Sequence, residues 1–280
     1  MRPIDQRTAL VTGATDGMGK ALASELAARG ATVLLHGRDE ARLEAAVREI
    51  RHGTGNERVL PYRADFSGLE EVRKLAAEIE RDAERLDLLV NNAGIRLGRP
   101  GSGREVSAEG YELTFAVNYL APFLLTNLLL ALLRRSAPAR VVNVASAGQF
   151  PIDFDDVMLE RAYDGVRAYR QSKLAVVMFT VELAQRLRAD AEPSVTVNAL
   201  HPATFMNTRM AYEAGIQPQS SIEDGVAATL RLAVSAGFDG VTGRYFDGMS
   251  ESRAENQAYD AGARRRLWRL SETLVGLGHE

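Results

Sequence analysis

The chain has 280 residues, of which 46% are hydrophobic and 25% are charged, and this is enough to bury the core of one α/β domain. A net charge of −3 disfavours a nucleic-acid-binding surface, and the absence of cysteine excludes disulfides, thiol catalysis and thiolate metal sites. The four histidines are scattered without the spacing of metal ligands, so we predict no metal centre.

Two segments bear on the location of the protein. Residues 1–7 are polar and contain no apolar signal segment, which predicts a cytoplasmic location. The most apolar run, residues 121–133, is shorter than the roughly 20 apolar residues that a membrane-spanning helix needs. This run therefore indicates a helix that is buried or faces another subunit, and no membrane span.

Short apolar runs alternate with amphipathic stretches along the whole chain, and no Pro- or Ser-rich linker divides it. The runs predict strands at residues 8–11, 31–36, 59–63, 86–91, 139–145, 195–200 and 243–246. The stretches predict helices at about residues 17–29, 39–51, 67–85, 105–133, 167–189, 221–236 and 260–275. Near-continuous apolar strands with crossover helices are typical of an α/β fold with a parallel, doubly wound sheet and helices on both faces. Ligands of such sheets bind at the carboxyl ends of the strands.

A glycine-rich segment follows the first predicted strand and opens the first helix. It reads Thr12-Gly13-Ala14-Thr15-Asp16-Gly17-Met18-Gly19. Glycines let the backbone turn tightly, and they let a pyrophosphate approach the N–H groups at a helix N-terminus. The spacing Gly-x3-Gly-x-Gly differs from the dinucleotide fingerprint Gly-x-Gly-x-x-Gly, so an ordinary strand–helix turn is the alternative.

Only three of the 34 basic residues are lysines, and one of them, Lys173, follows Tyr169 by four positions on a predicted helix. Residues four apart share a helix face, and an ammonium beside a phenol favours the phenolate. A tyrosine in such a pair can act as a general acid or base near neutral pH. For this pair alone, a Tyr and a Lys stacked on a solvated helix is the alternative.

Together these landmarks resemble the short-chain dehydrogenase/reductase family, and the resemblance covers nearly the full chain. The matches, in the family's order, are the glycine turn, Asp65, Asn91-Asn92-Ala93-Gly94, Asn118, Ser146, Tyr169, Lys173 and His201-Pro202. The long stretch between Ser146 and Tyr169, the segment 241–246 and the tail 263–272 look most like the retinol-dehydrogenase-like branch. The resemblance implies a single Rossmann domain, residues 1–280, that transfers hydride between a nicotinamide dinucleotide and a carbonyl or alcohol substrate.

The resemblance also implies roles for the catalytic positions. Tyr169 would transfer the proton to or from the substrate oxygen, and Lys173 would favour its ionised form and hold the nicotinamide ribose. Ser146 would hydrogen-bond the same substrate oxygen. Asn118 would hold a water that relays protons from Lys173 to solvent, although a mid-helix Asn is usually a polar-face residue.

The resemblance also implies a set of cofactor-binding positions, most of which lie just after the ends of predicted strands. They are Gly13, Thr15, Asp16, Gly17, Met18, Gly19, Arg38, Asp65, Phe66, Asn92, Ala93, Gly94, Tyr169, Lys173, Pro202 and Thr204. Asp65 would accept a hydrogen bond from the adenine amine, or it would only cap the next helix. Asn91 is expected to have a structural role in its turn.

The end of the second predicted strand bears on the choice between NADP and NAD. NAD enzymes place a carboxylate there to hold the ribose 2′-hydroxyl. This chain has Gly37 at that position, followed by Arg38, which can pair with a 2′-phosphate, and by Asp39, which is expected to cap a helix. Asp16 argues the other way, because many NADP enzymes carry Arg or Lys at its position. We predict NADP, with NAD the less favoured alternative.

The segment after the sixth predicted strand departs from the family pattern of Pro-Gly followed by a threonine. Ala203 follows Pro202, and Thr204 and Thr208 compete for the role of binding the nicotinamide carboxamide. We expect residues 203–220 to form a lid over the substrate. Its apolar side chains suggest a fairly apolar small-molecule substrate; they are Phe205, Met206, Met210 and Tyr212.

We therefore predict an oxidoreductase that transfers hydride between NADP(H) and a carbonyl or alcohol substrate. One alternative is a family member recruited to a redox-neutral isomerisation or cyclisation, and another is a non-catalytic dinucleotide sensor. The presence of Tyr169, Lys173, Ser146 and Asn118 disfavours both alternatives.

Two helices are expected to meet a partner subunit. Residues 123–133 are apolar nearly all round the helix, and residues 174–179 form a second apolar run just after Lys173. A helix packed on a sheet normally shows one polar face, so a wholly apolar one needs a second cover. In the family these two helices pair with their copies, which predicts a homodimer or homotetramer joined through a four-helix layer.

Overall fold

The computed structural model describes residues 1–95, 103–189, 195–207, 212, 215 and 217–278. Thr208, Met210 and parts of the predicted lid therefore lie outside the described residues.

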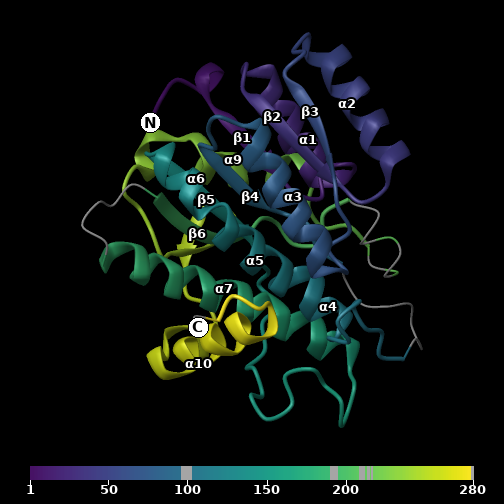
Figure 1. The fold of residues 1–280 in the computed structure, drawn as a ribbon, viewed down its shortest axis with the longest axis vertical. Helices are drawn as coiled ribbons and strands as arrows, with labels where there is room; N and C mark the ends of the chain where they lie inside the picture. Colours follow the sequence, from purple (N-terminus) through teal and green to yellow (C-terminus); the bar gives the residue numbers. More distant parts are fainter. Residues whose placement is uncertain (96–102, 190–194, 208–211, 213–214, 216, 279–280) are drawn as a thin grey trace.

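One eight-stranded sheet runs through the molecule in the order β3-β2-β1-β4-β5-β6-β7-β8 (Figure 1). Its strands are β1 (Thr8–Val11), β2 (Thr32–Gly37), β3 (Val59–Arg63), β4 (Leu88–Asn91), β5 (Ala139–Val144), β6 (Val195–His201), β7 (Tyr245–Asp247) and β8 (Ser250–Ser252). Every neighbouring pair is parallel except β7 with β8. This arrangement confirms the predicted α/β fold with a doubly wound parallel sheet, to which the structure adds the antiparallel strand β8.

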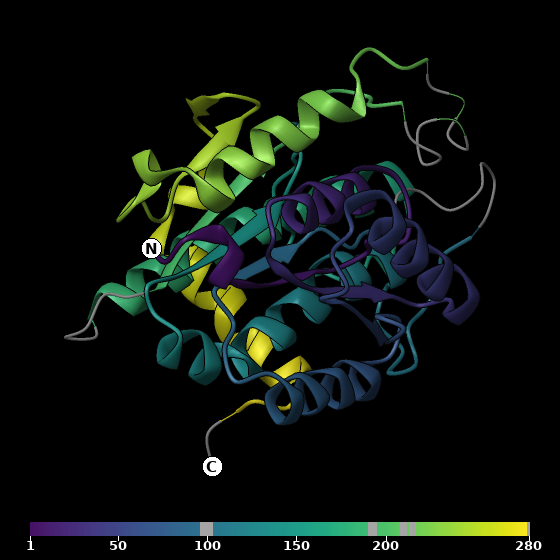
Figure 2. The same cartoon turned by 90° about the horizontal axis from the view of Figure 1, so that it is seen from above.

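The strands are apolar on both faces because helices cover both faces of the sheet. In β1, Leu10 packs into one core cluster while Ala9 and Val11 pack into the other, as the two-residue alternation of a strand requires. One face carries α1 (Gly17–Ala28), α2 (Glu40–Thr54) and α9 (Ile222–Val234), and the other carries α3 (Leu69–Asp82), α5 (Ala121–Leu128) and α7 (Gly165–Ala189). Figure 2 shows the sheet between these two layers.

The structure contradicts the predicted helix at 105–133 in two ways: the helix begins later, and it is divided into several segments. Residues 106 and 112 form an isolated antiparallel bridge, and the buried carboxylate of Glu112 accepts hydrogen bonds from the N–H groups of Thr114 and Phe115, which starts the helix at residue 113. The segments that follow are α4 (Leu113–Phe115), a π-helical turn (Ala116–Leu120), α5 and α6 (Leu130–Arg135). No helix among the described residues is both long enough and apolar enough to cross a membrane.

The C-terminal helix α10 (Ala261–Leu274) packs against α5 and α7 (Figure 1). The ring centroid of Trp268 lies 5.0 Å from that of Phe123 and 5.9 Å from that of Phe179. The hydroxyls of Tyr119 and Ser271 share a hydrogen bond of 2.6 Å. These contacts cover, within one chain, Phe123 and Phe179, which belong to the two apolar runs that were expected to meet a partner subunit.

Phe123 and Phe179 therefore need no cover from a second subunit, whereas Leu128 and Leu130 remain partly exposed. The homodimer or homotetramer itself stays a prediction. Sedimentation velocity at micromolar concentration tests it, and a single species of 30.5 kDa would contradict it.

Replacing Trp268 with alanine should lower the free energy of unfolding by about 3–5 kcal/mol, because the change leaves a cavity between Phe123 and Phe179. The change also removes the contact of the Trp268 ring with the Arg186 guanidinium, whose carbon lies 4.1 Å from the ring centroid. Urea unfolding measures the loss. The control is Arg269→Ala on the exposed face of the same helix, which should change the free energy by less than about 0.5 kcal/mol. A similar result for both variants would show that α10 is not held through Trp268.

Candidate active site

A cavity of about 770 Å³ opens at the carboxyl edge of the sheet, where the segments after β1 to β6 meet. Its volume lies in the range of about 300–1,000 Å³ that is typical of small-molecule sites. Every residue predicted for the site lines this cavity except Asn118. Strands that are far apart in the sequence thus bring the predicted residues together, as the switch point of a doubly wound sheet does.

The glycine turn after β1 has no room for side chains at two positions. Gly13 has a φ of +63°, and a Cβ added to it would lie 2.7 Å from the Cα of Ala93. A Cβ on Gly19 would lie 2.4 Å from the carbonyl oxygen of Gly13. The glycines therefore let the turn pack directly on the segment after β4 and leave the amino end of α1 open to the cavity.

Thr12 and Asn92 hold the turn in place. The Thr12 hydroxyl oxygen accepts hydrogen bonds of 3.0 Å from the N–H groups of Asn92 and Ala93. The Asn92 amide nitrogen donates to the carbonyl oxygens of Thr12, at 2.8 Å, and of Gly13, at 3.0 Å. Asn92 thus supports the turn through its side chain, while Ala93 lines the cavity beside it.

Asn91 has a structural role, as predicted, but it acts between elements and not in its turn. It points away from the cavity, and its amide nitrogen donates to the Thr126 hydroxyl at 2.9 Å and to the Asn143 amide oxygen at 2.8 Å. These bonds join β4 to α5 and β5.

Three acidic residues at the strand ends have local partners. Asp39 caps α2 by accepting from the N–H of Arg42 at 2.9 Å, as predicted, and Asp16 caps α1 by accepting from the N–H of Gly17 at 2.7 Å. Asp65 does not cap α3, because Gly68 is the residue before that helix; it accepts from the N–H of Ser67 at 2.9 Å.

Tyr169 and Lys173 lie on one face of α7 and both line the cavity, with the Lys173 Nζ 5.8 Å from the Tyr169 ring centroid. Lys173 is only 6% exposed, and its ammonium donates to the carbonyl oxygen of Val144 at 2.9 Å. Burial lowers the pKa of Lys173 from 10.5 to about 8. The ammonium is therefore charged at neutral pH and strongly desolvated, so a nearby anion or phenolate would stabilise it.

Asn118 lies in the π-helical turn, a type of distortion that is frequent at functional sites. Its amide binds the backbone of Ile95 through both atoms: the oxygen accepts at 2.7 Å and the nitrogen donates at 2.9 Å. A Cβ on Gly94 would lie 3.2 Å from the Asn118 oxygen and 3.6 Å from the Lys173 Nζ, so the glycine keeps a space between them. Asn118 thus positions the segment after β4, and the predicted water relay stays a prediction.

Ser146 follows β5, and hydrogen bonds to its backbone carbonyl and to its hydroxyl hold it in place. Its carbonyl oxygen accepts from the Tyr245 hydroxyl at 3.1 Å and from the Gln149 amide at 2.8 Å. Its hydroxyl oxygen accepts from the N–H of Gly148 at 3.1 Å. Because the hydroxyl accepts in that bond, its proton remains available for an oxygen atom in the cavity.

A family model described as short chain dehydrogenase matches residues 7–218. The chain belongs to the short-chain dehydrogenase/reductase family. It is 39% identical to mouse retinol dehydrogenase 13 over 292 residues, which cover 98% of this chain and 85% of the relative. These matches confirm the predicted family and its retinol-dehydrogenase-like branch.

Two solved structures show the same fold. An uncharacterised protein from Mycobacterium paratuberculosis has a TM-score of 0.79 and 32% identity, over 97% of this chain and 94% of that one. The Pseudomonas aeruginosa RhlG/NADP active-site complex has a TM-score of 0.69 and 29% identity, over 88% of this chain and 97% of that one.

His36 is a residue of this dehydrogenase/reductase site that the sequence reasoning missed. Its Nδ1 accepts from the N–H of Gly13 at 3.1 Å, its Nε2 lies 3.1 Å from the carbonyl oxygen of Ala64, and its ring stacks on Phe66 with centroids 4.3 Å apart. Burial lowers the pKa of His36 to about 4, so the ring is neutral and its proton lies on Nε2. The only signal in the sequence is a polar residue near the end of an apolar strand, since its partners follow other strands.

The segment after β6 gives Thr204 a partner within the protein. The Thr204 hydroxyl lies 3.0 Å from Nε2 of His201, and both residues line the cavity. Phe205 follows with a φ of +44°, a left-handed conformation that is uncommon outside glycine and is often found at functional sites. Thr208 lies outside the described residues, so both threonines stay candidates for the carboxamide.

Replacing Lys173 with methionine should stabilise the cofactor-free protein at pH 7. Because the folded-state pKa is about 8 and the ordinary value is 10.5, the folded protein binds fewer protons than the unfolded chain between these pH values, and its stability rises with pH there. Below pH 8 the wild type carries the full unfavourable free energy of the buried ammonium, at most roughly 3 kcal/mol.

Thermal unfolding from pH 7 to pH 10 measures the effect. The stability advantage of K173M should be largest at pH 7 and should shrink as the pH rises. Lys74→Met, at an exposed lysine paired with Glu71, is the control and should show no such dependence. An advantage that does not change with pH would contradict the buried-ammonium explanation.

Proposed function

We propose that this protein is an oxidoreductase that uses NADP(H) to interconvert a carbonyl group and an alcohol on a fairly apolar small molecule. The observation that carries the proposal is that one cavity is lined by the acid–base pair Tyr169–Lys173, by Ser146 and by the glycine turn. A dinucleotide-type turn and an acid–base pair in the same cavity are what hydride transfer to a carbonyl needs.

The residues present fit a nicotinamide dinucleotide, which supplies the hydride when it is bound. The glycine turn and the amino end of α1, beyond the Gly17 N–H that Asp16 binds, would hold the pyrophosphate. Asp65 and Phe66 would contact the adenine, and Ala93 and Gly94 the adenine ribose. The space that Gly94 leaves beside Lys173 suits a ribose hydroxyl, which the ammonium would bind.

The chain's own groups would then handle the proton. In reduction, the Tyr169 hydroxyl would donate its proton to the substrate oxygen as negative charge develops there, and in oxidation it would accept that proton. The Lys173 ammonium would stabilise the phenolate through charge. The Ser146 hydroxyl would donate a hydrogen bond to the same oxygen from a fixed position, since its main chain is held by Tyr245 and Gln149.

The preference for NADP rests on the end of β2. A Cβ on Gly37 would lie 2.3 Å from the Thr15 methyl, so a carboxylate at this position would have to displace Thr15. Arg38 lines the cavity and is exposed, and within the described part of the chain its side chain makes no ion pair or hydrogen bond. Such a guanidinium is available for a 2′-phosphate. The bound NADP of the related Pseudomonas aeruginosa RhlG structure supports the same preference.

The apolar character of the substrate rests on the apolar side chains that line the cavity. They include Ile95, Val106, Leu113, Val117, Val166 and Phe205. Burying an apolar substrate against them contributes about 25 cal/mol for each Å² removed from water.

Incubation of the purified protein with NADPH and a panel of apolar aldehydes and ketones tests the proposal, with the loss of NADPH absorbance as the readout. We expect reduction, with kcat/KM at least about tenfold higher for NADPH than for NADH, a difference of ~1.4 kcal/mol. A panel without any carbonyl is the control. NADPH binding without consumption by any carbonyl would overturn the proposal and favour a dinucleotide sensor.

A further inference from the structure

Arg170 follows Tyr169 on α7 and lines the same cavity. Its Cγ and Nε each lie 3.8 Å from the point where a Gly148 Cβ would stand, and the Ser146 hydroxyl oxygen lies 3.6 Å from that same point. The guanidinium stem thus passes beside the loop that carries Ser146. The permanent positive charge of Arg170 and the Ser146 hydroxyl thus lie on either side of Gly148 in the lining of one cavity.

The other arginines around this loop have partners within the chain. Arg104 lies 3.8 Å from the Glu160 carboxylate, Arg167 lies 3.4 Å from that of Asp153, and Arg266 lies 3.2 Å from that of Asp155. The Arg170 side chain, in contrast, makes no ion pair, hydrogen bond or ring contact within the residues that the structure describes.

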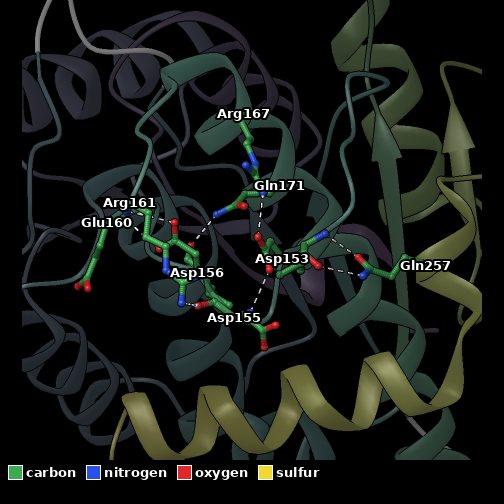
Figure 3. A network of polar contacts seen from close by, with 10 residues as sticks. Asp153, Asp155, Asp156, Glu160, Arg161, Arg167, Gln171 and Gln257 are labelled. Carbon is green, nitrogen blue, oxygen red and sulfur yellow. Dashed lines mark hydrogen bonds and ion pairs between the residues drawn. The ribbon is translucent and has the colours of Figure 1, made fainter.

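Carboxylates of the loop between β5 and α7 already accept hydrogen bonds from backbone N–H groups. Asp153 accepts from the N–H of Asp155 at 3.0 Å, and Asp156 accepts from the N–H groups of Glu160, at 2.8 Å, and Arg161, at 3.2 Å. Figure 3 shows Asp153 beside Arg167, and Asp156 beside residues 160 and 161.

The loop is also tied to α7 and to the C-terminal region. The Gln171 amide donates to the carbonyl oxygen of Val157 at 2.7 Å, and Gln257 binds both backbone groups of Ile152, as Figure 3 also shows. The loop is therefore held at two points by side-chain to backbone hydrogen bonds. No carboxylate of this network neutralises Arg170.

The cavity that Arg170 lines also has accessible apolar side chains, one of which, Val166, lies four residues before Arg170 on α7. Val106, Val166 and Phe205 line it and are 49%, 43% and 37% exposed. A guanidinium beside an apolar wall selects a ligand with an apolar body and an anionic end. The planar fork of arginine binds a carboxylate through two parallel hydrogen bonds, and a single arginine balances the single charge of a carboxylate.

We propose that the substrate is an apolar carbonyl or hydroxy compound that carries a carboxylate, and that Arg170 is the specificity residue that binds this carboxylate. The inference rests on the proposed oxidoreductase function and names its substrate class.

The test compares two substrates of nearly the same shape, ω-oxo-octanoate and its methyl ester, in NADPH-dependent reduction. The wild type should show a kcat/KM for the acid at least about tenfold above that for the ester. In Arg170→Met this ratio should fall to about one, mainly through a higher KM for the acid, because the ion pair forms in the ground state and the transition state alike. Arg170→Lys keeps the positive charge but loses the planar guanidinium. Its acid-to-ester ratio should therefore lie between those of the wild type and of R170M. High salt should lower the wild-type ratio.

Arg188→Met is the matched control. It removes the same charge from the same helix, but its guanidinium binds the carbonyl oxygen of Thr242 at 3.0 Å, so the acid-to-ester ratio should not change. An equal ratio in the wild type and R170M, or a wild type that prefers the ester, would overturn the inference while leaving the oxidoreductase proposal intact. If the enzyme reduces other carbonyls of the panel but neither of these two compounds, the inference is overturned and the proposed function stands. If NADPH binds and no carbonyl at all is reduced, the proposed function fails and the inference fails with it.

Discussion

Replacing Tyr169 with phenylalanine should lower kcat by about 10³-fold, within the range of about 10²–10⁴ that general acid–base catalysis contributes. The change removes the transferable proton and little volume. The proton is needed only in the transition state, so the affinity for NADPH should stay nearly the same. Steady-state kinetics with a carbonyl substrate measures kcat, and fluorescence titration measures NADPH binding.

Tyr111→Phe is the matched control for this experiment. The Tyr111 hydroxyl donates to the carbonyl oxygen of Leu274 at 2.8 Å and does not line the cavity. Its loss should lower stability by about 1 kcal/mol and leave kcat unchanged. A Y169F enzyme that turns over within a few-fold of the wild type would remove Tyr169 from the acid–base role.

Replacing Arg38 with aspartate should invert the cofactor preference. The new carboxylate repels a 2′-phosphate and can accept a hydrogen bond from a 2′-hydroxyl, as the acidic residue of NAD enzymes does. We expect the ratio of kcat/KM for NADPH to that for NADH to fall by about 10²-fold or more, equivalent to roughly 3 kcal/mol. Initial rates with both cofactors and one carbonyl substrate measure the ratio.

Arg48→Asp gives the same charge change on the exposed face of α2, where Arg48 pairs with Glu44 at 3.5 Å. It should leave the ratio nearly unchanged, because a solvent-exposed charge is screened by salt. If R38D and R48D behave alike, Arg38 does not bind the 2′-phosphate and the NADP preference needs another cause.

The sequence predicted most of the sheet because each strand contains its own signal. The four residues of β1 are all buried, and the run Thr8–Val11 is recognisable without any partner. The strand β8 could not be found in this way, because Ser250–Ser252 is fully exposed and has no apolar pattern. The helix start at Leu113 was missed for a related reason, because Glu112 acts there as a buried acceptor and a carboxylate is usually read as a surface residue.

The shared face of Tyr169 and Lys173 was predictable because its geometry is local: residues four apart on a helix share a face whatever the rest of the chain does. The spacing did not assign a role to the pair, and only the resemblance of the whole chain to a family did so. The burial that lowers the pKa of Lys173 was not predictable, since it comes from β5 and from the segment after β4.

The sequence by itself determined the strands β1 to β7, most of the amphipathic helices, the glycine turn and the Tyr169–Lys173 face, because each depends on residues close together in the chain. Only the tertiary structure decided that His36 holds the glycine turn, that Trp268 covers α5 and α7, and that Arg170 has no carboxylate partner in the loop beside it. Each of these facts depends on contacts between elements that are far apart in the chain. The parallel sheet and the packing of α10 bring those elements together, and no local pattern encodes the contacts.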